Sequence, residues 1–338
     1  MTAHWVTLFT KRSFAALTTA LAIPLAAALM TNGAAAQDPA ATYPNRPIRI
    51  VVPYAAGGGI DILARLIGQK LSESLGQPVI VESKPGASGE LAAEFVKNAA
   101  PDGYTLMVTS NGPMAVSPAT NAKLRYSPLR DFAPIGLIAS FPLVLVVNND
   151  LPIHSMSEFV AYAKAHPDKA NYAEPSVAFQ LVIESLKQKT GAPLQLIPYK
   201  SSSEAVLSVM GGTTIAALVD SGPAAGSIKS GKVRAIGITS AARSPEFPDV
   251  PTMVEAGFPD MSISFWSGMF APAGVPPAIV KKLEGELVRI VKLPDIQQRM
   301  TSMAEVPEGR PSEETRRFVE GQITMFTAIA RSANITRD

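Results

Sequence analysis

Residues 47–65 constrain the fold most, because a short apolar run there leads into three glycines and then into a helical pattern. Ile48–Val52 is rich in β-branched residues and is stopped by Pro53, which is typical of a buried strand. Gly57–Gly59 follow, and apolar residues at helical spacing begin at Ile60. Glycines let the backbone turn its N–H groups inward, and the first N–H groups of a helix have no partner within the helix. This order predicts a site for a carboxylate or phosphate, although a tight turn without a ligand explains the same residues.

The glycine loop does not match the common nucleotide-binding motifs. A dinucleotide fingerprint needs a glycine where this chain has Ile62, and a P-loop ends in Gly-Lys-Ser/Thr, which does not follow here. The motif alone therefore leaves the anion unidentified.

The N-terminus has the pattern of a secretory signal peptide. Lys11 and Arg12 precede the apolar stretch 14–30, and Ala34–Ala36 provides small residues before Gln37. We predict cleavage after Ala36, by ordinary Sec export in preference to the twin-arginine route, and a mature protein located in the periplasm. Position 37 is not cysteine, so the sequence does not indicate a lipid anchor.

Charge and composition exclude several classes of function. Of 30 basic and 28 acidic residues, Lys11 and Arg12 fall in the signal segment, which has no acid, so the mature chain has 28 of each. A chain of zero net charge does not indicate nucleic-acid binding. Cysteine is absent, and no histidine pair or acidic cluster has metal-ligand spacing, so we predict neither metal nor cofactor.

Strand and helix patterns alternate along the mature chain, which predicts α/β lobes built on parallel sheets. Ligands bind such sheets beyond the carboxyl ends of the strands, and loops 54–60 and 109–113 lie there. Two further strand patterns flank Pro142, and an extended stretch covers 263–270. We interpret these as two passages between lobes, with lobe 1 formed by 37–141 plus 264–338 and lobe 2 by 142–263. A ligand cleft is expected between the lobes.

Several runs resemble the Bug family, the periplasmic solute-binding proteins of tripartite tricarboxylate transporters. The matching runs include 52–61, 100–105, 197–200, 249–252 and 271–274. The resemblance covers nearly the whole mature chain. It implies a type II periplasmic-binding-protein fold, in which two α/β lobes are joined by two crossing strands around an interlobe cleft. It also implies capture of a small carboxylate-bearing ligand, an organic acid or amino acid, and its delivery to membrane permease subunits.

The resemblance further implies one strand-to-helix loop in each lobe that holds a ligand carboxylate with backbone N–H groups. In lobe 1 the implied residues are Tyr54, Ala55, Gly58, Gly59, Ile60 and Asp61, with Ser110 and Asn111 beside them. In lobe 2 they are Ala173, Glu174 and Ser176, together with the strand-end residues Tyr199 and Asp220. Most relatives carry a Gly/Ser-rich segment at the lobe 2 loop, whereas this chain has Ala173–Gln180, which contains no glycine.

Three of these acids have alternative interpretations. Asp61 either pairs with Arg65 near the helix N-terminus, or has a functional role in which it orders the loop or receives a ligand donor. Asp220 either caps the next helix or lines the cleft. Glu174 is either a solvated acid before Pro175 or a carboxylate that faces the cleft. In the cleft it would repel a second ligand carboxylate and attract an ammonium or hydroxyl, which leads to the hypothesis that monocarboxylates, amino acids or hydroxy acids are preferred over citrate.

Enzyme function is not predicted. There is no G-x-S-x-G run, and His154 and His166, the only histidines after the signal segment, are expected on the surface. The alternatives that stay open are an exported α/β hydrolase acting on a small carboxylate and a protein that presents its ligand to a sensor kinase. We expect a monomer that is not embedded in the membrane.

Overall fold

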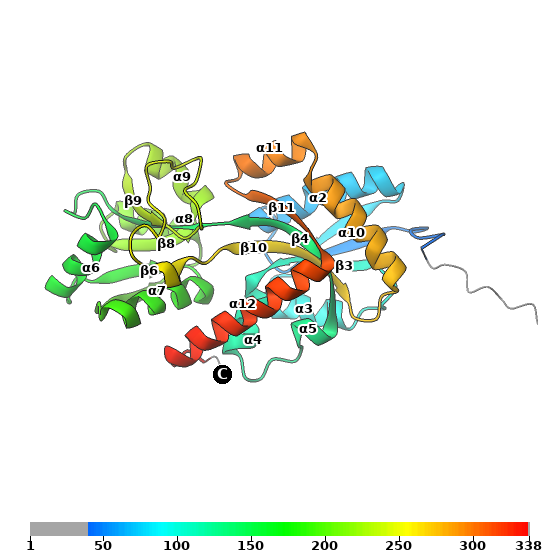
Figure 1. Cartoon of the computed structure of the whole chain (residues 1–338), viewed down its shortest axis with the longest axis horizontal. Coiled ribbons are helices and arrows are strands. Elements are labelled where there is room, and N and C mark those ends of the chain that lie inside the picture. Colours follow the sequence, from blue (N-terminus) through cyan, green and yellow to red (C-terminus); the bar gives the residue numbers. More distant parts are fainter. Residues whose placement is uncertain (1–39, 337–338) are drawn as a thin grey trace, which may run out of the picture.

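The computed structural model describes residues 40–336, which form an elongated molecule with two α/β lobes (Figure 1). The predicted signal segment and its cleavage site lie outside these residues. Each lobe is built on its own sheet, one of six strands and one of five. The prediction of two α/β lobes is confirmed.

The six-stranded sheet of lobe 1 has the order β11-β4-β10-β3-β1-β2. Its strands are β1 (Ile48–Val52), β2 (Val79–Ser83), β3 (Thr105–Ser110), β4 (Phe132–Phe141), β10 (Phe265–Pro272) and β11 (Val306–Pro311). β1 is parallel to β2 and β3, whereas β10 is antiparallel to β3 and β4, and β11 is antiparallel to β4. The prediction of a parallel sheet was therefore wrong for half of the strands. The antiparallel half forms because the chain leaves along β4 and returns along β10, so these strands run against each other.

The five-stranded sheet of lobe 2 has the order β7-β6-β8-β5-β9. Its strands are β5 (Leu143–Asn148), β6 (Asn171–Glu174), β7 (Gln195–Pro198), β8 (Ala216–Asp220) and β9 (Val233–Ile238). β6 is parallel to β7 and β8, so the residues at their carboxyl ends gather at one edge of the sheet. Glu174, Tyr199 and Asp220 lie at that edge, whereas β5 runs antiparallel to both of its neighbours.

The helices cover the sheets much as the apolar spacing predicts. They are α2 (Gly59–Leu75), α3 (Glu90–Lys97), α4 (Ser117–Thr120), α5 (Pro128–Asp131), α6 (Met156–Ala165), α7 (Val177–Thr190), α8 (Ser202–Met210), α9 (Ser221–Lys229), α10 (Pro277–Val291), α11 (Pro294–Ser302) and α12 (Ser312–Ser332), with short turns η1 (Ala87–Gly89), η2 (Gly112–Val116) and η3 (Pro259–Met261). α2 buries Leu63, Ile67 and Leu71 and ends at Gly76, which has a left-handed φ of 69°. At residues 251–256 the sequence predicts one or two helical turns, and the structure has a turn there in which the Ala256 amide donates to the Thr252 carbonyl and Thr252 bridges Ile238.

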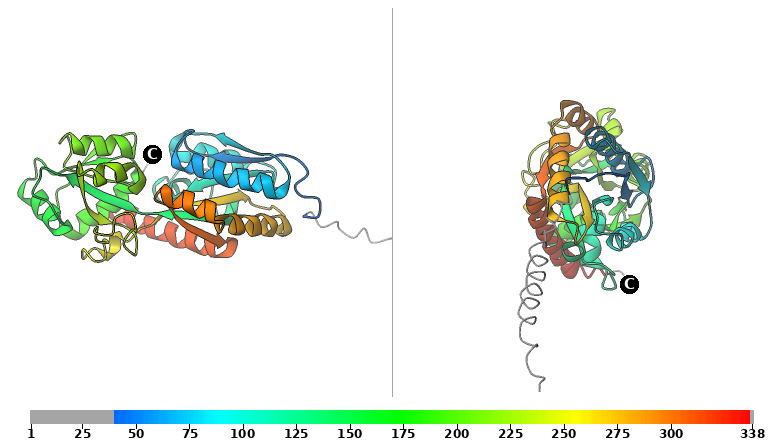
Figure 2. Two further views of the ribbon diagram at one scale, coloured as in Figure 1. Left: turned by 90° about the horizontal axis from the view of Figure 1, so that it is seen from above. Right: turned by 90° about the vertical axis from the view of Figure 1, so that its right-hand side faces the viewer.

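The two lobes are joined by paired strands and by a long helix that packs against both of them. β4 leads into β5 through Pro142, and β10 returns beside it with Phe265 opposite Phe141 (Figure 1). α12 extends along both lobes (Figure 2), and its residues Phe326 and Ala330 belong to the apolar core of lobe 2. Because α12 contributes to both lobes, the predicted lobe boundaries stay a prediction.

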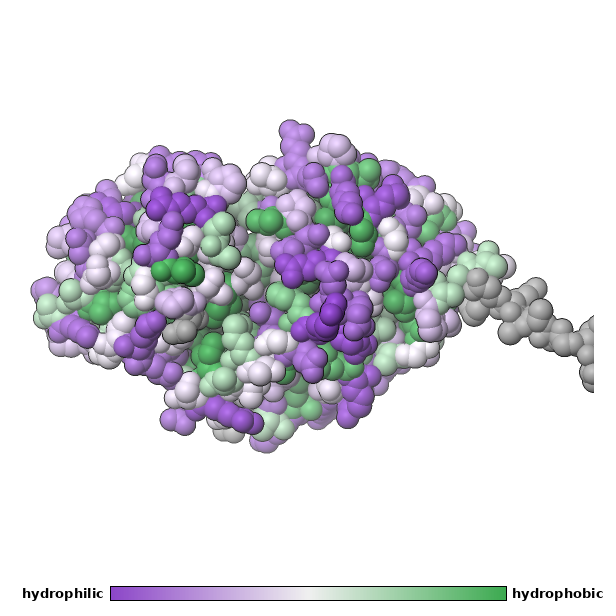
Figure 3. All heavy atoms as spheres, viewed as in Figure 1, coloured by the Kyte–Doolittle hydropathy of each residue, from purple (hydrophilic) through white to green (hydrophobic). Residues whose placement is uncertain are grey.

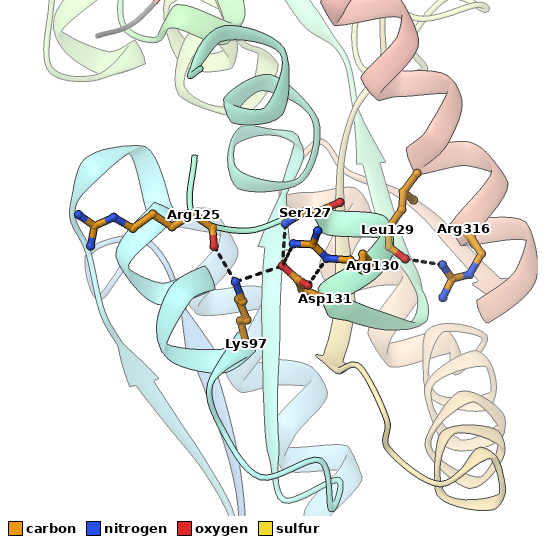
Figure 4. Close-up of polar contacts among 7 residues, drawn as sticks. All are labelled: Lys97, Arg125, Ser127, Leu129, Arg130, Asp131 and Arg316. Carbon is orange, nitrogen blue, oxygen red and sulfur yellow. Dashed lines mark hydrogen bonds and ion pairs between the residues drawn. The ribbon is translucent and has the colours of Figure 1, made fainter. Parts of the chain in front are cut away.

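A polar cluster fixes the segment that enters β4 (Figure 4). The amide of Ser127 donates a 2.8 Å hydrogen bond to Asp131, and Lys97 and Arg130 form ion pairs with the same carboxylate at 3.3 and 2.8 Å. The Arg130 hydrogen bond is the largest of several contacts that lower the pKa of Asp131 to about 2. Arg316 of α12 donates to the Leu129 carbonyl at 2.9 Å, which ties the long helix to the same turn.

The surface carries mixed side chains. Hydrophilic and hydrophobic residues are interspersed over the face drawn in Figure 3. None of the helices within residues 40–336 has the length and apolarity needed to cross a bilayer.

Candidate ligand-binding site

A cavity of about 410 Å³ lies between the two lobes. Lobe 1 contributes Tyr54, Ser88, Gly112, Val116 and Ser117, and lobe 2 contributes Glu174, Pro175, Ser176, Val177, Ala178 and Tyr199. A space of this size suits a small molecule. Among these lining residues there is no lysine, arginine or histidine, so an anion bound here would depend on neutral donors.

The lobe 2 wall is the junction of β6 with α7. Ser176 has extended backbone angles and caps the helix, and its Oγ accepts a hydrogen bond of 3.3 Å from the Ala178 amide. The Ser176 carbonyl accepts from the amides of Phe179 and Gln180. The Val177 amide is the first of this 14-residue helix and so has no acceptor within the helix, and the residues at this positive end of the helix line the cavity.

The lobe 1 wall is formed where β1 and β3 end. The hydroxyl of Tyr54, which follows β1, lies 2.5 Å from the Oγ of Ser110 at the end of β3. Gly112 allows this approach, because a Cβ there would lie 3.1 Å from the Tyr54 hydroxyl oxygen. Burial raises the pKa of Tyr54 to about 12, with the charge of Asp220 adding to it and the hydrogen bond to Ser110 opposing it. The hydroxyl therefore stays protonated and neutral at physiological pH.

A left-handed turn completes lobe 1's side of the cavity. Ala87 and Ser88 have φ values of 47° and 54°, which non-glycine residues rarely adopt. Ser117, which also lines the cavity, donates a hydrogen bond of 2.8 Å to Glu90 at the start of α3. Strained backbone of this kind is held by its surroundings and is common at functional sites.

Glu174 is a buried acid in the cavity wall. It is only 7% exposed, and among the described residues its Oε1 has no hydrogen-bond partner. Burial raises the pKa of Glu174 to about 7, and a hydrogen bond from the Ser176 amide partly opposes that rise. The interpretation of Glu174 as a solvated acid is therefore wrong.

The glycine loop itself lies beside the cavity and does not line it. Ala55–Gly59 are exposed, and no side chain caps the N-terminus of α2. Asp61 is buried and accepts hydrogen bonds from the Gly57 amide, Arg65 and Ser83. Asp61 thus both pairs with Arg65 and orders the loop, as two of its interpretations had it, and its carboxylate oxygens are already bonded within the protein.

The thirteen predicted site residues therefore separate into groups. Tyr54, Glu174, Ser176 and Tyr199 line the cavity, whereas Ala55, Gly58, Gly59, Ile60, Asp61, Ser110, Asn111, Ala173 and Asp220 do not. Ser110 supports Tyr54, and Asn111 is buried with its Oδ1 accepting a 3.1 Å hydrogen bond from the Trp266 amide. Ala173 points into the core of lobe 2. As contacts of a ligand, these residues stay predictions.

Seven of the residues that line the cavity were not predicted from the sequence. They are Ser88, Gly112, Val116, Ser117, Pro175, Val177 and Ala178. Gly112 lies in the 109–113 loop, and Ser88 lies between Gly86 and Gly89, so glycines that are typical of turns stand in both segments. Val116 and Ser117 lie on a helical segment that was not predicted from the sequence, so no sequence pattern indicated that they line the cavity.

A second contact between the lobes involves two acids. Asp220 accepts a 2.8 Å hydrogen bond from Ser202, and no bond from its side chain caps α9, so the cap interpretation was wrong. Gly222 packs against the Met303 carbonyl, 3.2 Å from where a Cβ would stand. Glu305 follows Met303 closely and is 7% exposed, and burial together with the charge of Asp220 raises its pKa to about 8. In residues 40–336, no group of three or more acids or histidines is arranged to hold a metal.

Comparisons with known proteins match nearly the whole described chain. The sequence profile of the Tripartite tricarboxylate transporter family receptor matches residues 63–335. Protein BugT of Bordetella pertussis is 35% identical over 307 residues, which cover 90% of this chain and 94% of that protein. A solved structure of a periplasmic transporter is 35% identical with a TM-score of 0.78, covering 88% of this chain and all of the other. MatC from Rhodopseudomonas palustris, solved with bound malate, is 33% identical with a TM-score of 0.74 and covers 85% of this chain and 99% of its own.

Proposed function

This chain belongs to the Tripartite tricarboxylate transporter family receptors, and from that membership we propose a specific role for its interlobe cavity. The protein captures a small carboxylate-bearing solute between its lobes in the periplasm. It then delivers that solute to the membrane permease subunits of a tripartite tricarboxylate transporter. A relative of the same fold was solved with malate, a small carboxylate, which supports this class of ligand.

The observation that carries the proposal is the set of neutral donors in the cavity wall. The Val177 amide stands at the positive end of α7, and the Tyr54 hydroxyl comes from the opposite lobe. A carboxylate that bridged these two donors would hold the lobes together. Micromolar affinity corresponds to about 8 kcal/mol, which one well-bound carboxylate and the burial of a small ligand can supply.

The composition of the cavity wall supports a receptor over a hydrolase. Its serines are Ser88, Ser117 and Ser176, and no histidine stands among the lining residues to act as a base. Ser117 donates to Glu90, and Ser176 caps α7, so two of the three hydroxyls already have structural partners. His154 and His166 are exposed, as predicted. We therefore propose no reaction and no cofactor.

The proposed location follows from the N-terminal pattern. The chain is exported, is cleaved after Ala36 and works as a monomer. Intact-mass measurement of the protein recovered from the periplasm would show a mature chain beginning at Gln37. A mass that still includes residues 1–36 would contradict the proposed processing.

The proposed function is tested by a thermal-shift screen of mono-, di- and tricarboxylates, hydroxy acids and amino acids. A ligand that binds only the folded state raises Tm by mass action. The Tyr54→Phe variant should bind the best acid about tenfold more weakly, since it removes one hydrogen bond to a charged group. Tyr162→Phe, on α6 and stacked on His166, is the matched control and should bind normally. If no acid raises Tm, the proposal fails.

A further inference from the structure

Among the described residues that line the cavity, Glu174 is the only acid. It stands three residues before Val177, whose backbone amide is the proposed hydrogen-bond donor to the ligand carboxylate. We propose that Glu174 selects the ligand, so that the cavity takes a carboxylate bearing a hydrogen-bond donor, an ammonium or a hydroxyl, on the adjacent carbon and rejects a second carboxylate there. This inference rests on the proposed function and narrows its ligand class.

One oxygen of the Glu174 carboxylate, Oε1, has no hydrogen-bond partner among the described residues. A buried polar atom without a hydrogen bond is costly, and native structures rarely leave one. Glu174 is more than nine-tenths buried, and its Oε1 has no partner among the described residues, while the Ser176 amide supplies a hydrogen bond to the carboxylate. A donor on the ligand would complete the shell of this carboxylate.

The lining residues of the cavity offer no cation to compensate the charge of Glu174. Buried carboxylates are ordinarily paired with a positive group. The cavity wall contains no lysine, arginine or histidine, so the lining residues offer Glu174 no such group. A positive or hydrogen-bonding group must then come from the ligand.

Glu174 also lies close to the proposed binding site for the ligand carboxylate. Glu174 and the Val177 amide belong to one short segment, so a carboxylate held at the start of α7 lies near that of Glu174 and is repelled by it. A donor on the carbon next to the ligand carboxylate can point at Glu174 while the ligand carboxylate meets the amide. A second carboxylate at the same carbon adds repulsion and has no donor to offer.

The experiment uses four acids that differ in one substituent. They are hexanoate, 2-hydroxyhexanoate, 2-aminohexanoate and butylmalonate, which carry hydrogen, hydroxyl, ammonium and carboxylate at the same carbon. Propionate, lactate, alanine and methylmalonate repeat the comparison on a shorter chain. Affinities are measured by calorimetry at pH 8, where Glu174 with a pKa of about 7 is mostly ionised.

We expect the wild type to bind the amino or hydroxy acid at least about tenfold more tightly than the plain acid, and the malonate most weakly. Glu174→Gln should lose that preference for the amino acid and gain affinity for the malonate by a larger factor than it gains for the plain acid, whose single carboxylate is also relieved of repulsion. Glu320→Gln, which neutralises an exposed acid on α12, is the control and should keep the wild-type order.

The outcomes separate this inference from the function on which it rests. An unchanged order of affinities in Glu174→Gln, or a wild type that prefers the plain acid or the malonate, overturns the role of Glu174 and leaves carboxylate capture intact. If none of these acids binds either protein while another acid of the thermal-shift screen does, this inference fails and carboxylate capture stands; if no acid binds in either experiment, both fail.

Discussion

The carboxylate of Asp61 accepts a 2.9 Å hydrogen bond from the amide of Gly57, four residues earlier in the chain. This bond closes the glycine loop onto the first turn of α2, and Arg65 and Ser83 bond to the same carboxylate. The loop next to the cavity is thus shaped by an acid within the protein.

Replacing Asp61 should loosen the glycine loop and destabilise the protein. Asp61 is 2% exposed, so Asp61→Ala leaves the Gly57 amide without its acceptor, and we expect a loss of about 1–3 kcal/mol in the free energy of unfolding. The Arg65 hydrogen bond is the largest cause of the lowered pKa of Asp61. Because the pKa of Asp61 is lower in the folded state than the 3.8 of the unfolded chain, this carboxylate stabilises the folded protein at pH values above 3.8. That stabilisation is lost as the pH falls through the pKa of the folded state.

Urea unfolding at pH 7 and at pH 3 measures this effect. The difference between wild type and Asp61→Ala should be smaller at pH 3. Asp295→Asn, an exposed partner of Lys70, is the control and should change stability little. Equal stability of wild type and Asp61→Ala at pH 7 would show that the loop does not depend on this carboxylate.

Gly89 should tolerate no side chain. Its φ is 92°, and a Cβ there would lie 2.5 Å from Pro113 and 2.9 Å from Pro53. Backbone strain and overpacking together should make Gly89→Ala less stable by about 2–4 kcal/mol. Gly76→Ala is the matched control, since Gly76 has a φ of 69° with open space around it and should cost only about 1 kcal/mol. Equal losses in the two variants, measured by thermal unfolding, would contradict the close packing at Gly89.

Glu305 should make the protein less stable as pH rises. Its pKa is raised from 4.5 to about 8, mainly by burial and also by Asp220. The folded state therefore binds the proton more tightly than the unfolded state, so stability falls from about pH 4.5 until it levels off above pH 8. Glu305→Gln, which cannot ionise, should raise Tm by about 5 °C at pH 8 and leave it nearly unchanged at pH 4.5. A variant whose Tm has the same pH dependence as that of the wild type would contradict this role.

The elements that the sequence predicts well are those with local signals. Apolar spacing predicts helices over 156–165 and 277–291, and α6 and α10 have these bounds, because Ser155 caps the start of α6 and a proline stands in the first turn of α10. The antiparallel half of the lobe 1 sheet was not predictable in this way, since it depends on the return of β10 after more than 100 residues in the other lobe. β11 was missed because two prolines and a glycine interrupt its pattern.

The candidate site shows the same limit. Glu174, Ser176 and Tyr199 could be named because the family resemblance implied a lobe 2 site there, and the parallel strands β6 and β7 do end at one edge of the sheet. Which face of each loop lines the cavity depends on how the two lobes pack against each other, and local sequence patterns do not predict that packing. The glycine loop was therefore expected to line the cavity, whereas Tyr54 alone of that stretch does so.

The central claim is that the first amide of α7 binds a ligand carboxylate, and Val177→Pro tests it most directly. Proline is tolerated at the first position of a helix and removes only the N–H there, and the extended backbone of Ser176 suits the residue before a proline. Val177→Ala controls for the side chain. Calorimetry with the acid that binds the wild type most tightly should give an unchanged Kd for Val177→Ala and a Kd about tenfold or more higher for Val177→Pro. Equal affinity in the two variants would contradict the claim.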